Sequence, residues 1–133
     1  MGTPPLRARA AHAALALATI GVGLAVHLGG HALPPRLRDA LGDALWAAML
    51  VWWVSALWPA RPLRWRAGLA LGGAFAVEAS QLLRTPALDA VRATRFGHLV
   101  LGSDFDARDL PAYAAGVLAA AAAEWAWRRA TGR

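Results

Sequence analysis

Two groups of polar residues in this sequence have the types and the spacing to bind a ligand. Glu78 and Gln81 are three residues apart, so a helix would place both on one face. Asp89, Arg92 and Arg95 follow at intervals of three and would form one ridge of a short helix. Because an arginine guanidinium binds phosphates and carboxylates through paired hydrogen bonds, this ridge predicts a site for an anionic group.

The composition of the 133 residues excludes several kinds of chemistry. All fourteen basic residues are arginine, and the chain has no Lys and no Cys. It therefore lacks a lysine for a Schiff base or a P-loop, and it lacks a thiol nucleophile, a thiolate metal site and a disulfide. With 58% hydrophobic residues, it is too apolar for a disordered nucleic-acid-binding tail. We expect no nucleic-acid partner and no cofactor.

Charged residues are absent or rare in four stretches of 17 to 24 residues, at 10–33, 44–60, 67–83 and 110–127. A helix needs about 20 apolar residues to cross a bilayer core, with about 17 as the lower limit. The second stretch is apolar on all sides, whereas helices of a soluble bundle carry polar stripes. The first could also be a secretory signal, but it is long for a signal core. We therefore predict an all-α integral membrane four-helix bundle, forming a single domain over residues 1–133, with spans at about 10–33, 40–58, 66–84 and 109–127.

Helix-starting and small residues add detail to this bundle. Thr85 followed by Pro86 predicts an N-cap and a proline at the first helical position, opening a short helix that runs to about Arg95. We expect this helix to be re-entrant or interfacial and to lie between the third and fourth spans. Gly68 and Gly72 are four residues apart, which predicts close packing of the third helix on a neighbour.

The distribution of arginines predicts the orientation in the membrane. Four spans place the two termini and the middle loop on one side. That side would carry eight arginines (Arg7, Arg9, Arg61, Arg64, Arg66, Arg128, Arg129 and Arg133). The opposite side would carry six (Arg36, Arg38, Arg84, Arg92, Arg95 and Arg108). Because cytoplasmic loops are enriched in Arg, we expect both termini in the cytoplasm.

Alternating spans also bring most of the other polar residues to one face of the bundle. This face would gather Asp43, Glu78, Gln81, Arg84, Asp89, Arg92, Arg95, His98, Asp104, Asp106, Asp109 and Tyr113. Glu78 would lie about four residues inside the end of a membrane helix, where an unpaired carboxylate costs several kcal/mol. We therefore expect Arg92 or Arg95 to be its counter-ion.

Three interpretations of this polar face stay open. In the first, Arg92 and Arg95 hold an anionic lipid or a lipid-linked envelope intermediate, and acidic neighbours orient the arginines. In the second, the protein is an enzyme acting on such a lipid, with Glu78 or His98 as acid or base. In the third, the cluster is only structural and fastens a loop to the bundle. The binding interpretation assigns the ligand to Asp43, Glu78, Gln81, Asp89, Arg92, Arg95, His98, Asp109 and Tyr113.

One pair of histidines could suggest a metal site. His27 and His31 are four residues apart, with Asp39 and Asp43 further along the chain. This spacing suits two metal ligands on one helix face. However, Gly29 and Gly30 stand between the histidines and make a regular helix doubtful there. The sequence favours interfacial histidines, and we predict no metal.

Several short motifs occur in a characteristic order. They are residues 41–47, 75–82, 88–95 and 97–102, followed by Phe105, Asp109-Leu110, Tyr113 and Gly116. In this order the sequence resembles the family catalogued as domain of unknown function 2809, which consists of small bacterial membrane proteins. The resemblance covers roughly residues 42–116 and rests most specifically on Glu-x-x-Gln and Arg-x-x-Arg-x-Gly. It implies a membrane protein and supplies no chemistry.

A looser resemblance is to VanZ-like membrane proteins, which are associated with glycopeptide (teicoplanin) resistance. The matching positions are Glu78, Gln81, Asp89, Arg92, Asp109 and Gly116. The stretch from Arg92 to Asp109 is longer than in the VanZ-like pattern, and the Asn expected after the last Asp is missing.

Together these features predict a multi-pass protein of the bacterial cytoplasmic (inner) membrane. Its expected partners are membrane lipids, in particular an anionic or phosphate-bearing lipid, and a homo-oligomer is possible. The sequence favours a non-enzymatic role in the cell envelope, because no Ser or Cys stands at a recognisable nucleophile spacing.

Overall fold

The computed structural model describes residues 6–102 and 105–132, and every regular element in this part of the chain is helical. The elements are α1 (Leu6–Gly29), a short 3₁₀ helix η1 (Gly30–Ala32), α2 (Pro35–Leu57), α3 (Leu63–Ser80), α4 (Pro86–Ala93), α5 (Arg95–Leu101) and α6 (Asp109–Thr131). The predicted all-α class is confirmed. Asp104 and Arg133, which the sequence assigned to opposite faces, lie outside the described residues.

The short helix after α3 begins as the sequence predicts. Thr85 is its N-cap, and its side chain accepts a hydrogen bond from the Leu88 amide at 3.2 Å. The helix ends earlier than expected, at Ala93, and a second short helix, α5, follows at once. Thr94 both ends α4 and begins α5, because its hydroxyl accepts a hydrogen bond from the Gly97 amide at 3.0 Å. One capping residue therefore divides the expected segment into two helices.

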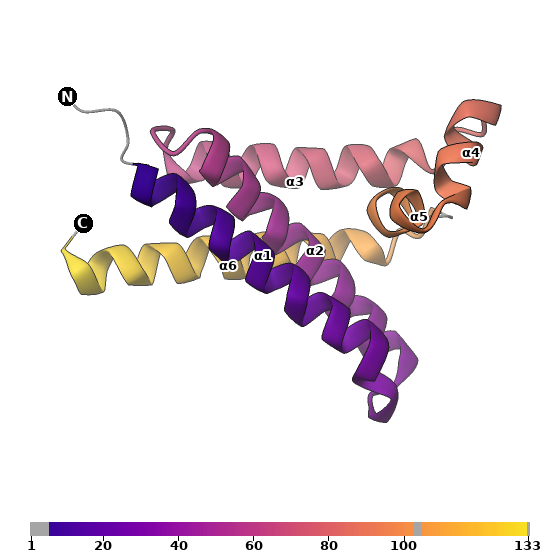
Figure 1. The fold of residues 1–133 in the computed structure, drawn as a ribbon, viewed down its shortest axis with the longest axis horizontal. Helices are drawn as coiled ribbons and strands as arrows, with labels where there is room; N and C mark the ends of the chain where they lie inside the picture. Colours follow the sequence, from indigo (N-terminus) through magenta and orange to yellow (C-terminus); the bar gives the residue numbers. More distant parts are fainter. Residues whose placement is uncertain (1–5, 103–104, 133) are drawn as a thin grey trace.

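The four long helices form two pairs that cross (Figure 1). α1 and α2 form an antiparallel hairpin, and α2 also packs against α3 and α6, which contact each other. The far end of the hairpin, around η1, projects away from α3 and α6 (Figure 1). The short helices α4 and α5 lie at the end of α3 that is distant from both chain termini (Figure 1).

Small residues make up much of the core between these helices. The buried hydrophobic side chains are Ala16, Ala47, Val51, Trp52, Ala56, Ala70, Ala74, Tyr113, Val117 and Ala120. Alanine on facing helices allows their backbones to approach closely. The predicted close packing through Gly68 and Gly72 is wrong, since a Cβ at either position would meet nothing within 4 Å. The close approach occurs instead at Gly116 of α6, against the backbone of Ala44 in α2.

Two helices within residues 6–102 and 105–132 are long and apolar enough to cross a membrane, α1 with η1 (Leu6–Ala32) and α2. This is fewer than the four spans expected from the sequence. α3 carries Arg64, Arg66 and Glu78 within its 18 residues, and these charges lower its hydropathy. Glu124 interrupts α6 in the same way.

Candidate functional site

A cavity of about 820 Å³ lies between the α1–α2 hairpin and the ends of α3, α5 and α6. We call it the main cavity. Most of its wall is apolar and comes from side chains such as Ile20, Leu24, Trp46, Met49 and Leu99. Its polar lining consists of Thr19, His27, Arg38, Asp39, Asp43, Gln81, His98, Asp106, Asp109 and Tyr113. An apolar cavity of this size with polar groups gathered from several helices is typical of a small-molecule site.

Carboxyl groups dominate the polar end of the main cavity. Asp39, Asp43, Asp106 and Asp109 line it, and the same four residues line a smaller adjoining cavity of about 160 Å³. The carboxyl groups of Asp43 and Asp109 lie close enough to interact with each other. The smaller cavity adds two arginines, Arg36 and Arg108.

Asp106 differs from the other three carboxyls because it has its own counter-ion. Its Oδ2 lies 3.1 Å from Nη2 of Arg108, and its Oδ1 accepts from the Arg108 backbone amide at 2.9 Å. The hydrogen bonds from the Arg108 side chain and amide hold the pKa of the Asp106 carboxyl below its usual range. Asp106 is therefore ionised and already paired.

Glu78 is buried directly behind this acidic end, with 0% of its surface exposed. Its Oε2 accepts a hydrogen bond from the Tyr113 hydroxyl at 2.7 Å, and its Oε1 accepts from the Asp106 amide at 2.8 Å. The predicted ion pair of Glu78 with Arg92 or Arg95 is wrong. Neutral donors satisfy the carboxylate, because α6 and the loop before it lie closer to Glu78 than the short helices do.

Arg92 has a different role from the predicted one. Its guanidinium donates to the carbonyl oxygens of Ser80 at 2.6 Å and Leu83 at 3.0 Å, and lies 3.5 Å from Oδ1 of Asp89. These carbonyls are at the end of α3, where the last turn of a helix lacks partners for its C=O groups. Arg92 therefore connects α4 to the end of α3 through backbone carbonyl groups. This agrees with the structural interpretation, in which the polar cluster fastens a loop to the bundle.

Gln81 connects two helix ends and keeps one polar atom without a donor among the described residues. Its Nε2 donates to the carbonyl of Leu101 at 2.6 Å, which links the end of α3 to the end of α5. Its Oε1 is buried and has no donor among the described residues. Gly102 ends α5 with a φ of 67°, and a side chain there would collide with Nε2 of Gln81. Glycine at this position lets the amide occupy the space between the two helices.

The structure thus brings together six of the nine predicted site residues and separates three. Asp43, Gln81, His98, Asp109 and Tyr113 line the main cavity, with Glu78 behind them. Asp89, Arg92 and Arg95 line neither cavity. His27 lines the main cavity, while Nδ1 of His31 lies 3.4 Å from Nη1 of Arg38. No group of three metal-ligating side chains occurs in the part of the chain that the structure describes.

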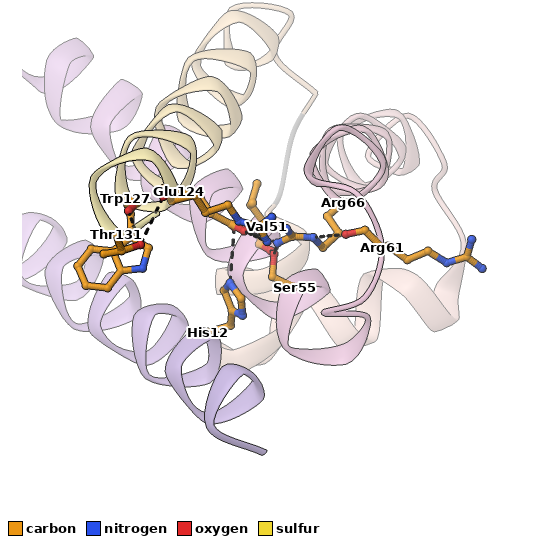
Figure 2. A network of polar contacts seen from close by, with 9 residues as sticks. His12, Val51, Ser55, Arg61, Arg66, Glu124, Trp127 and Thr131 are labelled. Atoms are coloured by element: carbon orange, nitrogen blue, oxygen red, sulfur yellow. Dashed lines mark hydrogen bonds and ion pairs between the residues drawn. The ribbon is translucent and has the colours of Figure 1, made fainter. Parts of the chain in front are cut away.

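A second polar network, at the opposite end of the bundle, was missed by the sequence analysis (Figure 2). Arg66 of α3 and Glu124 of α6 form a two-bond ion pair, with distances of 2.9 Å and 2.7 Å. Arg66 also donates to the Ser55 hydroxyl of α2, and His12 of α1 lies 3.5 Å from Glu124. Arg66 is fully buried, and Glu124 is 6% exposed. Side chains of all four long helices meet in this network.

A sequence signal for this network does exist. Glu124 is the one charge within the stretch 110–127, and Arg66 is the last of three arginines directly before the stretch 67–83. In an alternating bundle, the start of the third helix and the end of the fourth lie on the same side. Two opposite charges at equal depth on that side predict an ion pair.

Comparison with known families gives one match. A model of the family described as "Protein of unknown function (DUF2809)" matches residues 32–117. The matched range begins at the end of η1 and ends within α6, so it contains all nine predicted site residues. His12 and Glu124 of the second network lie outside it. The resemblance to this family is confirmed, while the looser VanZ-like resemblance stays a prediction. No solved structure matches the chain.

Proposed function

The chain belongs to the DUF2809 family, whose description assigns no activity, and from the geometry we propose that it is an inner-membrane protein of bacteria that binds a phosphate-bearing lipid in the main cavity without transforming it. The main cavity carries this proposal, because it joins a large apolar wall to a polar end, as a lipid requires. The proposal also includes four membrane spans with both termini in the cytoplasm.

The exposure of α1 supports a membrane environment. This helix and its extension form an apolar segment of 27 residues, yet Ala16 is its only buried side chain among the described residues. Leu17 and Leu28 are 60% and 70% exposed. The core helix of a soluble protein would be mostly buried, since exposed apolar surface is unfavourable in water. Lipid would cover the apolar surface of α1.

The pairing of charges supports α3 and α6 as further spans. Their 18 and 23 residues correspond to about 27 Å and 35 Å of helix, against a hydrocarbon core of about 30 Å. Their low hydropathy comes partly from Arg66, Glu78 and Glu124. These three side chains are buried and face protein partners, so lipid would not contact them.

The proposed orientation predicts which loops a reagent can reach. Both termini and the α2–α3 loop lie at one end of the molecule (Figure 1), and this end carries arginines at 7, 9, 61, 64, 128 and 129. The chain has no Cys, so single cysteines can be introduced without background. We expect a membrane-impermeant maleimide to label Ala32→Cys in intact spheroplasts, and to label Ala60→Cys and Thr131→Cys only after lysis. Equal labelling of all three in intact cells would refute the four-span topology.

Binding without catalysis is favoured by the position of Glu78. Its two oxygens are occupied by Tyr113 and the Asp106 amide, and none of its surface is exposed. A general acid or base must come within hydrogen-bonding reach of its substrate. Glu78 instead holds Tyr113 in place at the wall of the main cavity.

Lipid retention tests the binding proposal directly. Gly42 lines the main cavity, and a Cβ there would meet nothing within 4 Å, so Gly42→Phe should place a bulky side chain in the cavity and obstruct it without displacing the backbone. Gly73 is equally open but lies on the exposed face of α3, and Gly73→Phe is the matched control. In native mass spectrometry of gently solubilised protein, we expect wild type and Gly73→Phe to retain lipid and Gly42→Phe to lose it. Equal lipid retention by the folded Gly42→Phe variant would contradict the proposal.

A further inference from the structure

We infer that the end of the bundle opposite the main cavity binds the head groups of anionic phospholipids. This end comprises the start of α1, the α2–α3 loop and the end of α6 (Figure 1). We call it the arginine end, after six exposed side chains: Arg7, Arg9, Arg61, Arg64, Arg128 and Arg129. The inference rests on the membrane placement in the proposed function, but it concerns a different surface and the other leaflet, and the ligands are lipids outside the main cavity.

Contacts between distant segments bring these arginines to one end. Nη1 of Arg9 donates to two carbonyl oxygens at the end of α2, at 3.0 and 3.1 Å, which fixes the start of α1 there. Nε of the buried Arg66 donates to the Arg61 carbonyl at 2.9 Å, so the α2–α3 loop folds against the same network. Nη2 of Arg128 lies 2.8 Å from Oε1 of Glu124, which is the partner of Arg66. Three segments that are far apart in the sequence therefore present arginines around one buried ion pair.

The charge of the arginine end is not balanced by the protein. Glu124 is the only acidic side chain in residues 6–38, 44–77 and 110–132. Both of its oxygens accept hydrogen bonds from Arg66, which neutralises it within the bundle. Arg128 is thus a second cation on one carboxylate, and it is 45% exposed. A surface with several cations and no free carboxylate attracts anions from its surroundings.

Exposed tryptophans beside the arginines indicate that these anions belong to lipids. The guanidinium carbon of Arg61 lies 5.0 Å from the centre of the Trp65 ring, and that of Arg129 lies 4.7 Å from the centre of the Trp125 ring. Trp125 and Trp127 are 55% and 63% exposed. Exposed indole rings are unfavourable in water but are enriched at the level of the lipid head groups. Arginines stacked on such rings would lie at the depth of the lipid phosphates, to which a guanidinium donates paired hydrogen bonds.

Selectivity between lipids in a bilayer tests this inference. Full-length protein is reconstituted in phosphatidylcholine vesicles with a trace of spin-labelled phosphatidylglycerol or spin-labelled phosphatidylcholine, and electron paramagnetic resonance measures the fraction of label that the protein immobilises. We expect the association constant of phosphatidylglycerol to exceed that of phosphatidylcholine roughly fivefold, the ratio that corresponds to one arginine near an anionic surface. Because the arginines are exposed, about 1 M NaCl should remove most of this preference.

Two double variants locate the effect at one end of the molecule. Arg7→Gln/Arg64→Gln removes two exposed charges from the arginine end, and it should lower the preference for phosphatidylglycerol by about twofold or more. The matched control is Arg84→Gln/Arg95→Gln, which removes two exposed arginines at the opposite end, outside both cavities. We expect the control to keep the wild-type preference, because acidic side chains are interspersed with the arginines at that end.

The outcomes separate this inference from the proposed function. Equal association of both lipids with wild type would overturn it, as would an equal loss of preference in the two double variants. A preference that persists in high salt would also overturn it, since exposed charges would not be the cause. Stronger suppression by sodium phosphate than by sodium chloride at equal ionic strength would assign the arginines to free phosphate instead. Gly42→Phe should keep the full preference, so loss of lipid from the main cavity and loss of selectivity at the arginine end are independent results.

Discussion

Replacing Glu124 with alanine should lower the free energy of unfolding by about 3–5 kcal/mol, because it leaves a buried arginine without its counter-ion. Arg66 is fully buried, and Glu124 receives both ends of its guanidinium. The remaining acceptors of Arg66 are the Ser55 hydroxyl and the Arg61 carbonyl, which are neutral. Neither can compensate for the lost carboxylate in an apolar interior.

The measurement is thermal unfolding in detergent, with two matched variants. Arg128→Ala removes an ion pair from the same carboxylate at a side chain that is 45% exposed, and it should cost less than about 1 kcal/mol. The double variant Arg66→Met/Glu124→Leu removes both charges and should recover much of the lost stability. Wild-type stability of Glu124→Ala would show that Arg66 does not depend on this carboxylate.

Gly116→Ala should also be clearly destabilising, with an expected cost of about 1–3 kcal/mol from overpacking. A Cβ at this position would collide with the carbonyl group and Cα of Ala44. These are backbone atoms, so no side chain can rotate away to make room. α2 and α6 would have to separate at the point where they cross, next to Asp43 and Tyr113.

Gly72→Ala is the control for this prediction, because a Cβ at Gly72 in α3 would meet nothing within 4 Å. It should be neutral or slightly stabilising, since alanine is the better helix former. We would compare the unfolding midpoints of both variants with wild type in the same detergent. A Gly116→Ala variant as stable as Gly72→Ala would contradict the close approach of α2 and α6.

Local signals in the sequence account for where several helices begin. Pro35, Pro62 and the Thr85-Pro86 pair set the starts of α2, α3 and α4, because capping and the fixed φ of proline act within one turn. The break between α4 and α5 was missed, since Thr94 looks like an ordinary helical residue until its hydroxyl is seen to accept from Gly97. The family could also be recognised from the sequence, because each of its motifs is a contiguous stretch of the chain.

The sequence predicted at which end of the bundle the candidate site residues lie, but not which of them bond to one another. Alternating helices correctly placed Asp43, Gln81, Asp109 and Tyr113 at one end of the bundle, and they line one cavity there. The partner of Glu78 was not predictable. The sequence spacing suggested an arginine. In the structure α6 packs beside α3, so the Tyr113 hydroxyl and the Asp106 amide donate to the Glu78 carboxylate instead.

The sequence by itself therefore determined the helical class, the starts of α4 and α6, the family and the end of the molecule where polar groups collect. Tertiary structure decided which polar atoms meet. It paired Arg66 with Glu124 across 58 residues, used Arg92 to satisfy the end of α3, and directed the hairpin away from α3 and α6 to open the main cavity. The physical reason is the separation along the chain over which each effect acts. Caps and periodicity act within a few residues, whereas a buried polar group bonds to whichever donor or acceptor the packing of distant helices brings within about 3 Å.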